Sequence, residues 1–141
     1  MIAVIRVRGG VDKSKEIKDT LKMLNLKKVN HCVVVRKDPS IEGMIKKVKD
    51  FVTWGEISES VFEKLLENYG RKNNGTKLSD EEVNKIINAL KKNEKIDVKN
   101  FKLVFRLKPP KKGYKSIKKP YPKGALGYRG DKINELIERM M

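Results

Sequence analysis

The sequence predicts an α+β fold in which a small βαβαβ core precedes a helical insertion and a basic carboxyl-terminal region. Three observations support this prediction. Short β-branched runs alternate with amphipathic stretches within the first 57 residues. Residues 58–100 have helical periodicity with recognisable start signals. Charge is uneven, with a net +7 over residues 1–50, zero over 51–100 and +9 over 101–141.

The predicted core alternates three strands with two helices. Its strand segments are rich in valine and isoleucine, which favour strands. Between them, apolar residues recur every three or four positions, which is typical of amphipathic helices that cover one face of a sheet. We therefore expect strands over residues 2–7, 29–35 and 51–54, and helices over about 12–25 and 39–48.

Two helices are predicted in the insertion. Ser58 can cap the first, which ends at Gly70. Ser79 and Glu82 have the spacing of a capping box, so a second helix is expected from Ser79 to Leu90. The chain would then divide into the βαβαβ core (1–57), a helical insertion (58–100) and a carboxyl-terminal region with a strand, a basic arm and a last helix (101–141).

The carboxyl-terminal region is predicted as a strand, an arm and a helix. From residue 98 to 107 apolar and basic residues alternate, which predicts a strand with one basic, solvent-exposed face. Residues 109–130 contain four prolines and four glycines and have little apolar periodicity, so we expect an extended, irregular arm. A last helix should run from Asp131, as its cap, to Met140.

The composition points to a polyanionic partner. The 141 residues include 34 Lys and Arg against 18 Asp and Glu, which gives a net charge of +16. A field of this sign attracts nucleic acid first and anionic membranes second. Apolar runs are too short for a membrane span. The single cysteine, Cys32, fits a reducing cytoplasm, and with one histidine it provides no zinc site, so we expect no metal, no cofactor and no enzyme activity.

The carboxyl-terminal arm is the first candidate RNA-binding segment. Between Phe101 and Arg129 the sequence has ten lysines or arginines and no acidic residue. Lysines neutralise phosphates, tyrosines stack on unpaired bases, and glycines allow close approach. A disordered, solubilising tail is the alternative, which the following helix disfavours. The candidates are Lys108, Lys111, Lys112, Tyr114, Lys115, Lys118, Lys119, Tyr121, Lys123, Gly124, Gly127, Tyr128 and Arg129.

A second candidate group lies near the amino terminus, where the first predicted strand ends and the second begins. In a compact sheet these residues could meet at one edge, although a solvated charged face is an equally good interpretation. The basic residues of the second predicted helix lie off its apolar stripe and are candidates of the same kind. The group consists of Arg6, Arg8, Lys27, Lys28, Asn30, His31, Lys46 and Lys47.

Two stretches resemble the L-thirty family of large-subunit ribosomal proteins. The first is TLKMLNLKKVNHCVVVRKDPSIEGMIKKVKDFVTWGEI, from Thr20 to Ile57. Its hallmarks are Thr-Leu-x-x-Leu before the second strand, Lys-x-Asn at its start, and Pro-x-Ile-x-Gly-Met-Ile followed by Lys-Val. The second is KGALGYRGDKINELIERM, from Lys123 to Met140, which is similar to the carboxyl end of the long archaeal and eukaryotic form.

The resemblance implies a three-stranded antiparallel sheet with a distant likeness to ferredoxin folds. It also implies binding to large-subunit rRNA, including the neighbourhood of 5S rRNA, beside neighbouring ribosomal proteins in the cytoplasmic ribosome. Catalytic residues, cofactors and a small-molecule substrate are not expected from it. Two other functions remain open. One is a free RNA-binding or chaperone module, and the other is a protein adaptor in which Phe62, Leu66 or Tyr69 of the insertion would be exposed.

Overall fold

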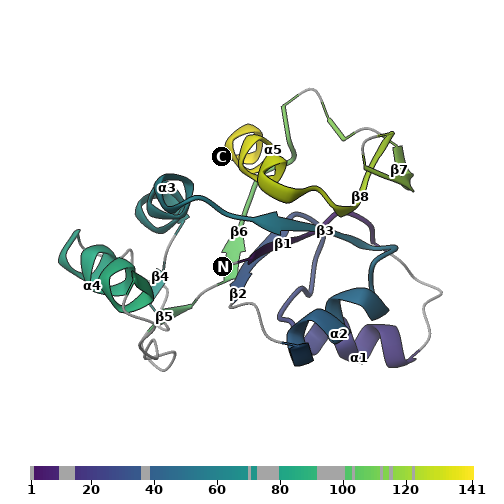
Figure 1. The fold of residues 1–141 in the computed structure, drawn as a ribbon, viewed down its shortest axis with the longest axis horizontal. Helices are drawn as coiled ribbons and strands as arrows, with labels where there is room; N and C mark the ends of the chain where they lie inside the picture. Colours follow the sequence, from purple (N-terminus) through teal and green to yellow (C-terminus); the bar gives the residue numbers. More distant parts are fainter. Residues whose placement is uncertain are drawn as a thin grey trace.

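A computed structural model of the chain describes residues 2–9, 15–35, 39–69, 71–72, 80–91, 101–102, 104–111, 113–114, 116–121 and 123–141. The fold combines a main sheet with helices on both of its faces (Figure 1). Its elements are β1 (Ile2–Arg6), α1 (Lys15–Met23), β2 (His31–Val35), α2 (Pro39–Lys47), β3 (Val52–Glu56), α3 (Glu59–Tyr69), β4 (Arg71–Lys72), α4 (Asp80–Lys91), β5 (Phe101–Lys102), β6 (Val104–Arg106), β7 (Ser116–Pro120), β8 (Gly124–Tyr128), the 3-10 helix η1 (Gly130–Lys132) and α5 (Ile133–Met140).

Six strands form the main sheet in the order β6-β2-β1-β3-β8-β7. The central strand β1 is antiparallel to both neighbours, so that Ile5 lies opposite Cys32 of β2 and opposite Thr53 of β3. On the outer sides, β6 is antiparallel to β2 and β8 is parallel to β3. The predicted α+β class and the antiparallel three-stranded core are therefore confirmed. The short strands β4 and β5 pair in a sheet of their own.

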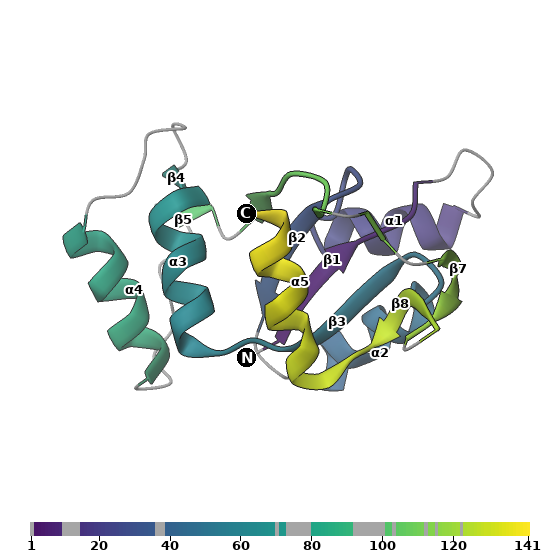
Figure 2. The same ribbon diagram turned by 90° about the horizontal axis from the view of Figure 1, so that it is seen from above.

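The two faces of the sheet carry separate apolar clusters. Ile2 and Val4 pack with residues of α1 and α2 on one face, and Ala3 and Ile5 pack with residues of α3, α4 and α5 on the other. Successive strand residues point to opposite faces, which produces this division. Figure 1 shows α1 and α2 on one side of the sheet and α5 on the other, and Figure 2 shows α3 between α4 and α5.

The carboxyl-terminal region differs from the predicted irregular arm. Within the strand expected over residues 98–107, the described residues form β5 and β6, and β6 joins the main sheet. Residues 116–120 and 124–128 form β7 and β8, so the prediction of irregular structure is wrong there. Two glycines among the five residues of β8 weaken its strand signal, although its first three residues are buried. Asp131 lies within η1 and does not cap α5, whose N-cap is Lys132.

The two helices predicted in the insertion are confirmed as α3 and α4. Ser58 caps α3 as expected, since its Oγ accepts a hydrogen bond of 3.3 Å from the Val61 amide. Phe62 and Leu66 are buried and Tyr69 is half-buried, which disfavours the alternative that these side chains form an exposed adaptor surface. Gly70 and the Ser79 cap lie outside the described residues. The division into segments 1–57, 58–100 and 101–141 stays a prediction.

Candidate nucleic-acid interface

One end of the main sheet, which we call the cationic end, gathers basic residues from both sequence regions. It is the end at which β1 and β6 finish and β2, β3 and β8 begin, because Arg6 pairs with Val52 and His31 pairs with Arg106. The helix α2 also ends just before β3 begins. The basic residues placed there are Arg6, Arg8, Lys27, Lys28, Lys46, Lys47, Lys49, Arg106, Lys108, Lys111, Lys119, Lys123 and Arg139.

The other end of the sheet is acidic. There β3 finishes at Glu56, and Glu59 lies in the first turn of α3. The Asn134 side chain donates hydrogen bonds to the carbonyl oxygens of Glu56 and Asp131, which places η1 at the same end. Lys132 of η1 also lies at this end, and Asp50 lies beside Phe51 at the cationic end. Basic residues still predominate at the cationic end, so a polyanion would be attracted there more strongly.

Arg6 is tied to the loop before β2. Its Nη1 donates to the carbonyl oxygens of Leu26 and Lys27, both at 2.9 Å, and its Nε donates to the Arg8 carbonyl at 3.3 Å. Burial lowers the pKa of the Arg6 guanidinium from its ordinary value. The side chain therefore fixes the loop that presents Lys27 and Lys28.

Two further arginines hold the carboxyl-terminal region in place, Arg129 against the sheet and Arg139 against the segment between β6 and β7. Arg129 donates from Nε to the Thr53 hydroxyl and from Nη2 to the Ala125 carbonyl, both at 2.9 Å. Arg139 donates from Nε to the Lys111 carbonyl at 3.2 Å and from Nη2 to the Gly113 carbonyl at 2.6 Å. The Arg139 bonds give partners to two main-chain oxygens in the segment between β6 and β7, and the Arg129 bonds join its own loop to β3 and β8.

His31 lies in a row of cations across three neighbouring strands. Arg6 of β1, His31 of β2 and Arg106 of β6 point to the same face, and Lys28 is close to them. Burial, reinforced by the positive charges of Arg106, Lys28 and Arg6, lowers the pKa of His31. Its Nδ1 has no hydrogen-bond partner among the described residues. A phosphate oxygen placed here would meet several cations at once.

The tyrosines of the predicted arm lie in three different environments. Tyr114 is half-buried and donates a 2.6 Å hydrogen bond to Asn30 Oδ1, which connects the arm to the start of β2. Tyr121 lies under the Arg129 guanidinium, 5.0 Å from the ring centroid. Tyr128 is exposed, but it lies beside Trp54 and donates to the Glu56 carboxylate, toward the acidic end. Tyr128 is thus set apart from the other two.

The two glycines among the candidates serve the fold. A Cβ at position 124 would collide with the carbonyl of Lys119, so Gly124 allows two segments of this chain to approach each other. Gly127 pairs with Thr53 and has a φ of 85°, a conformation that glycine adopts most readily. Close approach to RNA at these positions stays a prediction.

Comparison with known proteins identifies the family. Residues 2–52 match the family model described as ribosomal protein L30p/L7e. The chain is 43% identical to large ribosomal subunit protein uL30 of Methanosphaera stadtmanae, with 100% of both chains covered. It is 45% identical to the protein of that name from Archaeoglobus fulgidus, with 99% of both chains covered. The chain belongs to the L30p/L7e ribosomal protein family.

Membership confirms the resemblance seen in residues 20–57 and 123–140. An L30p/L7e protein is a structural ribosomal protein and not an enzyme. The single cysteine agrees with this, because Cys32 is fully buried and burial raises the pKa of its thiol to about 12, which removes the reactive thiolate. Cys32 and His31 also point to opposite faces of the sheet.

In the part of the chain that the structure describes, no cluster of His, Cys, Asp and Glu side chains could bind a metal ion. No helix among those residues is long and apolar enough to cross a bilayer.

The exposed lysines of this L30p/L7e protein are the side chains most available to a polyanion. They include Lys27, Lys28, Lys46, Lys108, Lys111, Lys119 and Lys123. Lys47 is also exposed and forms a 3.1 Å ion pair with Glu16, which solvent weakens. Lys112 and Lys115 lie outside the described residues, and of Lys118 only the backbone in β7 is described. RNA contact by any of these residues stays a prediction.

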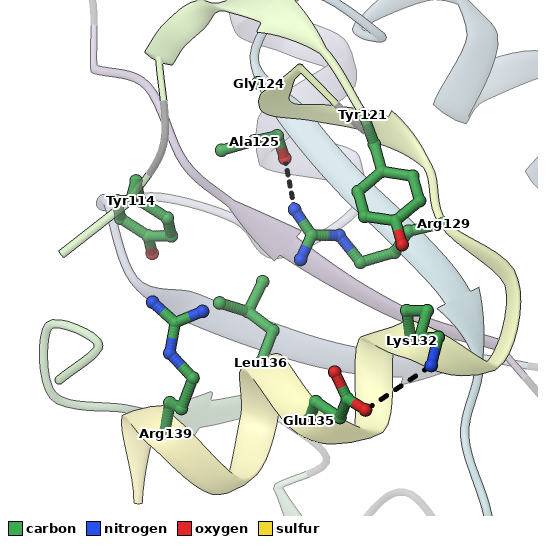
Figure 3. A pocket seen from close by; sticks show the side chains of 9 residues that line it. All are labelled: Tyr114, Tyr121, Gly124, Ala125, Arg129, Lys132, Glu135, Leu136 and Arg139. Atoms are coloured by element: carbon green, nitrogen blue, oxygen red, sulfur yellow. Dashed lines mark hydrogen bonds and ion pairs between the residues drawn. The ribbon is translucent and has the colours of Figure 1, made fainter. Parts of the chain in front are cut away.

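Sequence reasoning did not include Arg106, Lys132 and Arg139 among the candidates. Arg106 could have been included, because the alternating pattern already placed it on the solvent-exposed face of a predicted strand. Lys132, the N-cap of α5, and Arg139 of α5 lie seven positions apart and are on the same side of the helix axis. Only the structure shows that this face is turned toward β8 (Figure 3).

Proposed function

We propose that this L30p/L7e protein is a structural constituent of the large ribosomal subunit and binds large-subunit rRNA through its cationic end. The named relatives are large-subunit proteins that match the chain over its whole length. The observation that supports RNA binding is the gathering of exposed lysines at one end of a sheet whose other end is acidic. By its resemblance to the long archaeal form, we also propose a position near 5S rRNA and neighbouring ribosomal proteins.

Contacts to the RNA backbone should dominate over base reading in this arrangement. Lysine is a flexible point charge that suits phosphates and carries little sequence information. Arg6, Arg129 and Arg139 each donate at least two hydrogen bonds to oxygen atoms of their own chain. They fix the positions from which the lysines act, and the tertiary shape of the RNA would supply the specificity.

The salt dependence of rRNA binding tests whether lysines of the cationic end contact the RNA backbone. Replacing Lys28 and Lys108 together by alanine should reduce the slope of log affinity against log salt by about 1.5, if each lysine neutralises one phosphate. The matched control replaces Lys64 and Lys85, exposed lysines of α3 and α4, and should leave the slope unchanged. Binding of the full chain to large-subunit rRNA is measured over a salt series. Equal slopes for both double variants would contradict the proposed interface.

The alternative function is a free RNA-binding or chaperone module. Such a module would bind mixed single strands with little preference and would be recovered apart from ribosomes. We expect the protein instead to co-sediment with large subunits at moderate salt. Recovery only in the ribosome-free supernatant would favour the alternative. The adaptor hypothesis is disfavoured, because Phe62 and Leu66 are buried in the apolar cluster.

A further inference from the structure

A pocket of about 150 Å³ lies between α5 and β8, with Tyr114 and Tyr121 from the segments before and after β7 (Figure 3). The helix contributes Lys132, Glu135, Leu136 and Arg139, which follow the spacing of one helical face. Tyr114, Tyr121 and Arg129 line the opposite side. Figure 3 shows the Leu136 side chain pointing from α5 toward Arg129, so an apolar group lies between two guanidinium groups.

The walls of the pocket are fixed before any ligand binds. The Arg129 guanidinium is stacked on Tyr121 and bonded to Thr53 and Ala125. On the other wall, Arg139 is bonded to two carbonyl oxygens and Tyr114 to Asn30. A guanidinium has five N–H donors, and the bonds named here use two on each arginine, which leaves donors for a ligand. A ligand would therefore bind with little loss of side-chain entropy.

The size and chemistry of the pocket match one class of ligand. A cavity of this volume can contain a single six-membered aromatic ring. Arg129, Lys132 and Arg139 outnumber the one carboxylate, Glu135, so an anionic group is favoured at the rim. Guanidinium donors suit carbonyl oxygens, and tyrosine rings suit a flat base. A pyrimidine nucleotide combines a ring, carbonyl oxygens and a phosphate.

We propose that this pocket binds one unstacked pyrimidine nucleotide of an RNA partner. The proposal rests on the proposed function, since it names a nucleotide site within an RNA-binding protein. It differs from the cationic-end contacts, because here a base enters the protein and is not merely approached through its phosphate. Single-stranded positions of folded RNA provide such splayed nucleotides.

The test titrates the full chain with mononucleotides and follows the Leu136 methyl and the Tyr114 and Tyr121 ring signals by NMR. Uridine monophosphate should shift all three and saturate. Uridine should bind more weakly at the same signals, and adenosine monophosphate should bind more weakly than uridine monophosphate. If inorganic phosphate alone reproduces the shifts, the pocket is only an anion site and the proposal is wrong. Equal or tighter binding of adenosine monophosphate would also overturn it.

Two variants on α5 give effects of opposite sign, which misfolding cannot produce. Glu135→Gln removes the carboxylate from the rim and should tighten uridine monophosphate binding by about threefold, and Lys132→Gln should weaken it by about threefold. Both residues are exposed and pair with each other at 3.5 Å. Glu138→Gln, on another face of the same helix beside Lys64, is the matched control and should change nothing. The same direction of change in both variants would contradict the proposed pocket.

The outcomes also separate this inference from the proposed function. If uridine monophosphate leaves the pocket signals unshifted while rRNA binding still depends on Lys28 and Lys108, the inference is wrong and the proposed function stands. If the nucleotide fills the pocket but the chain binds no large-subunit rRNA, the proposed function fails. In that case the assignment to an RNA partner fails with it.

Discussion

In the amino-terminal unit, from β1 to β3 with α1 and α2, the contacts that join the elements are mostly between apolar side chains. Ile2, Val4, Leu21, Ile45 and Val52 belong to one buried cluster there. In the carboxyl-terminal segment from β6 to α5, arginine hydrogen bonds and close backbone contacts at glycines join the elements as well.

This difference explains why the two regions behave differently in sequence reasoning. A hydrophobic cluster leaves a periodic pattern, and the pattern predicts the elements. A bond such as that from Arg129 to Thr53 joins residues 76 positions apart and leaves no local pattern. A basic, glycine-rich segment can therefore be ordered by its own protein and still carry lysines for a partner.

The largest expected loss of stability comes from a substitution in the core of the amino-terminal unit. Ile45→Ala should reduce the free energy of unfolding by about 4 kcal/mol, because a buried side chain of α2 is lost and a cavity remains. Lys46→Ala, at the adjacent exposed position, should change it by less than about 0.5 kcal/mol. Urea denaturation measures both. Similar losses for the two variants would mean that the cluster does not carry this unit.

The next largest expected loss of stability comes from disrupting the contact between the two regions, where Gly55 meets Gly130. A Cβ at position 55 would collide with the carbonyl of Gly130, so Gly55→Ala should destabilise the protein by about 3 kcal/mol. The control is Gly43→Ala, because Gly43 lies in α2 with open space around it. That variant should stabilise the protein by about 0.8 kcal/mol through helix propensity. Thermal unfolding of both variants should therefore shift in opposite directions.

A smaller effect sharpens the role assigned to arginine. Arg129→Gln should cost about 2 kcal/mol, because the bonds to Thr53 and Ala125 are charge-assisted and partly buried. Arg106→Gln, an exposed arginine of β6, is the control and should have little effect on stability. Hydrogen exchange of the β8 amides should accelerate in the first variant more than that of the β1 amides. Uniform acceleration would contradict a local tether.

The smallest effect concerns pH and the single histidine. Because the folded state lowers the pKa of His31, the unfolded chain binds the proton more tightly. Stability should therefore fall as the pH is lowered from about 6.5 through the folded-state pKa, and be constant above that window. Comparison with His31→Gln isolates the contribution.

The same histidine reports on RNA. A phosphate beside His31 would favour the imidazolium, so bound rRNA should raise the pKa of His31 from its value in the free protein. NMR titration is unambiguous because the chain has one histidine. An unchanged pKa in the complex would place the RNA away from the row formed by Arg6, His31 and Arg106.

Much of the fold could be predicted from the sequence, and the reasons differ by element. The strands around Val4, Val33 and Val52 and the helices between them follow from apolar periodicity. The strand β8 could not be predicted, because its partner β3 is distant in sequence and its own residues, Gly-Ala-Leu-Gly-Tyr, read as a loop. The pairing of β5 with β4 and of β6 with β2 could not be predicted either, because each partner is distant in sequence.

The sequence predicts that the candidate site is basic. It does not predict which basic residues bond to their own chain and which are exposed to a partner. A meeting of the amino-terminal basic residues at one edge was one of two interpretations, the other being a solvated charged face. The sheet register also brings Lys108 to that end, which was not predicted. Nothing in the sequence distinguishes Arg129, which bonds to its own chain, from Lys123, which is exposed. That distinction depends on carbonyl oxygens whose positions are set only by the tertiary fold.

The order of strands in the sheet has a consequence for synthesis of the chain. β2, β1 and β3 can pair once residue 56 has emerged, but Phe105 and the apolar side of α5 come from later residues. Because synthesis adds about 5–20 residues per second, the face of the nascent sheet that carries Ala3 and Ile5 would remain exposed to solvent for several seconds. Chains arrested before residue 104 should therefore bind a hydrophobic dye or a chaperone, whereas completed chains should not.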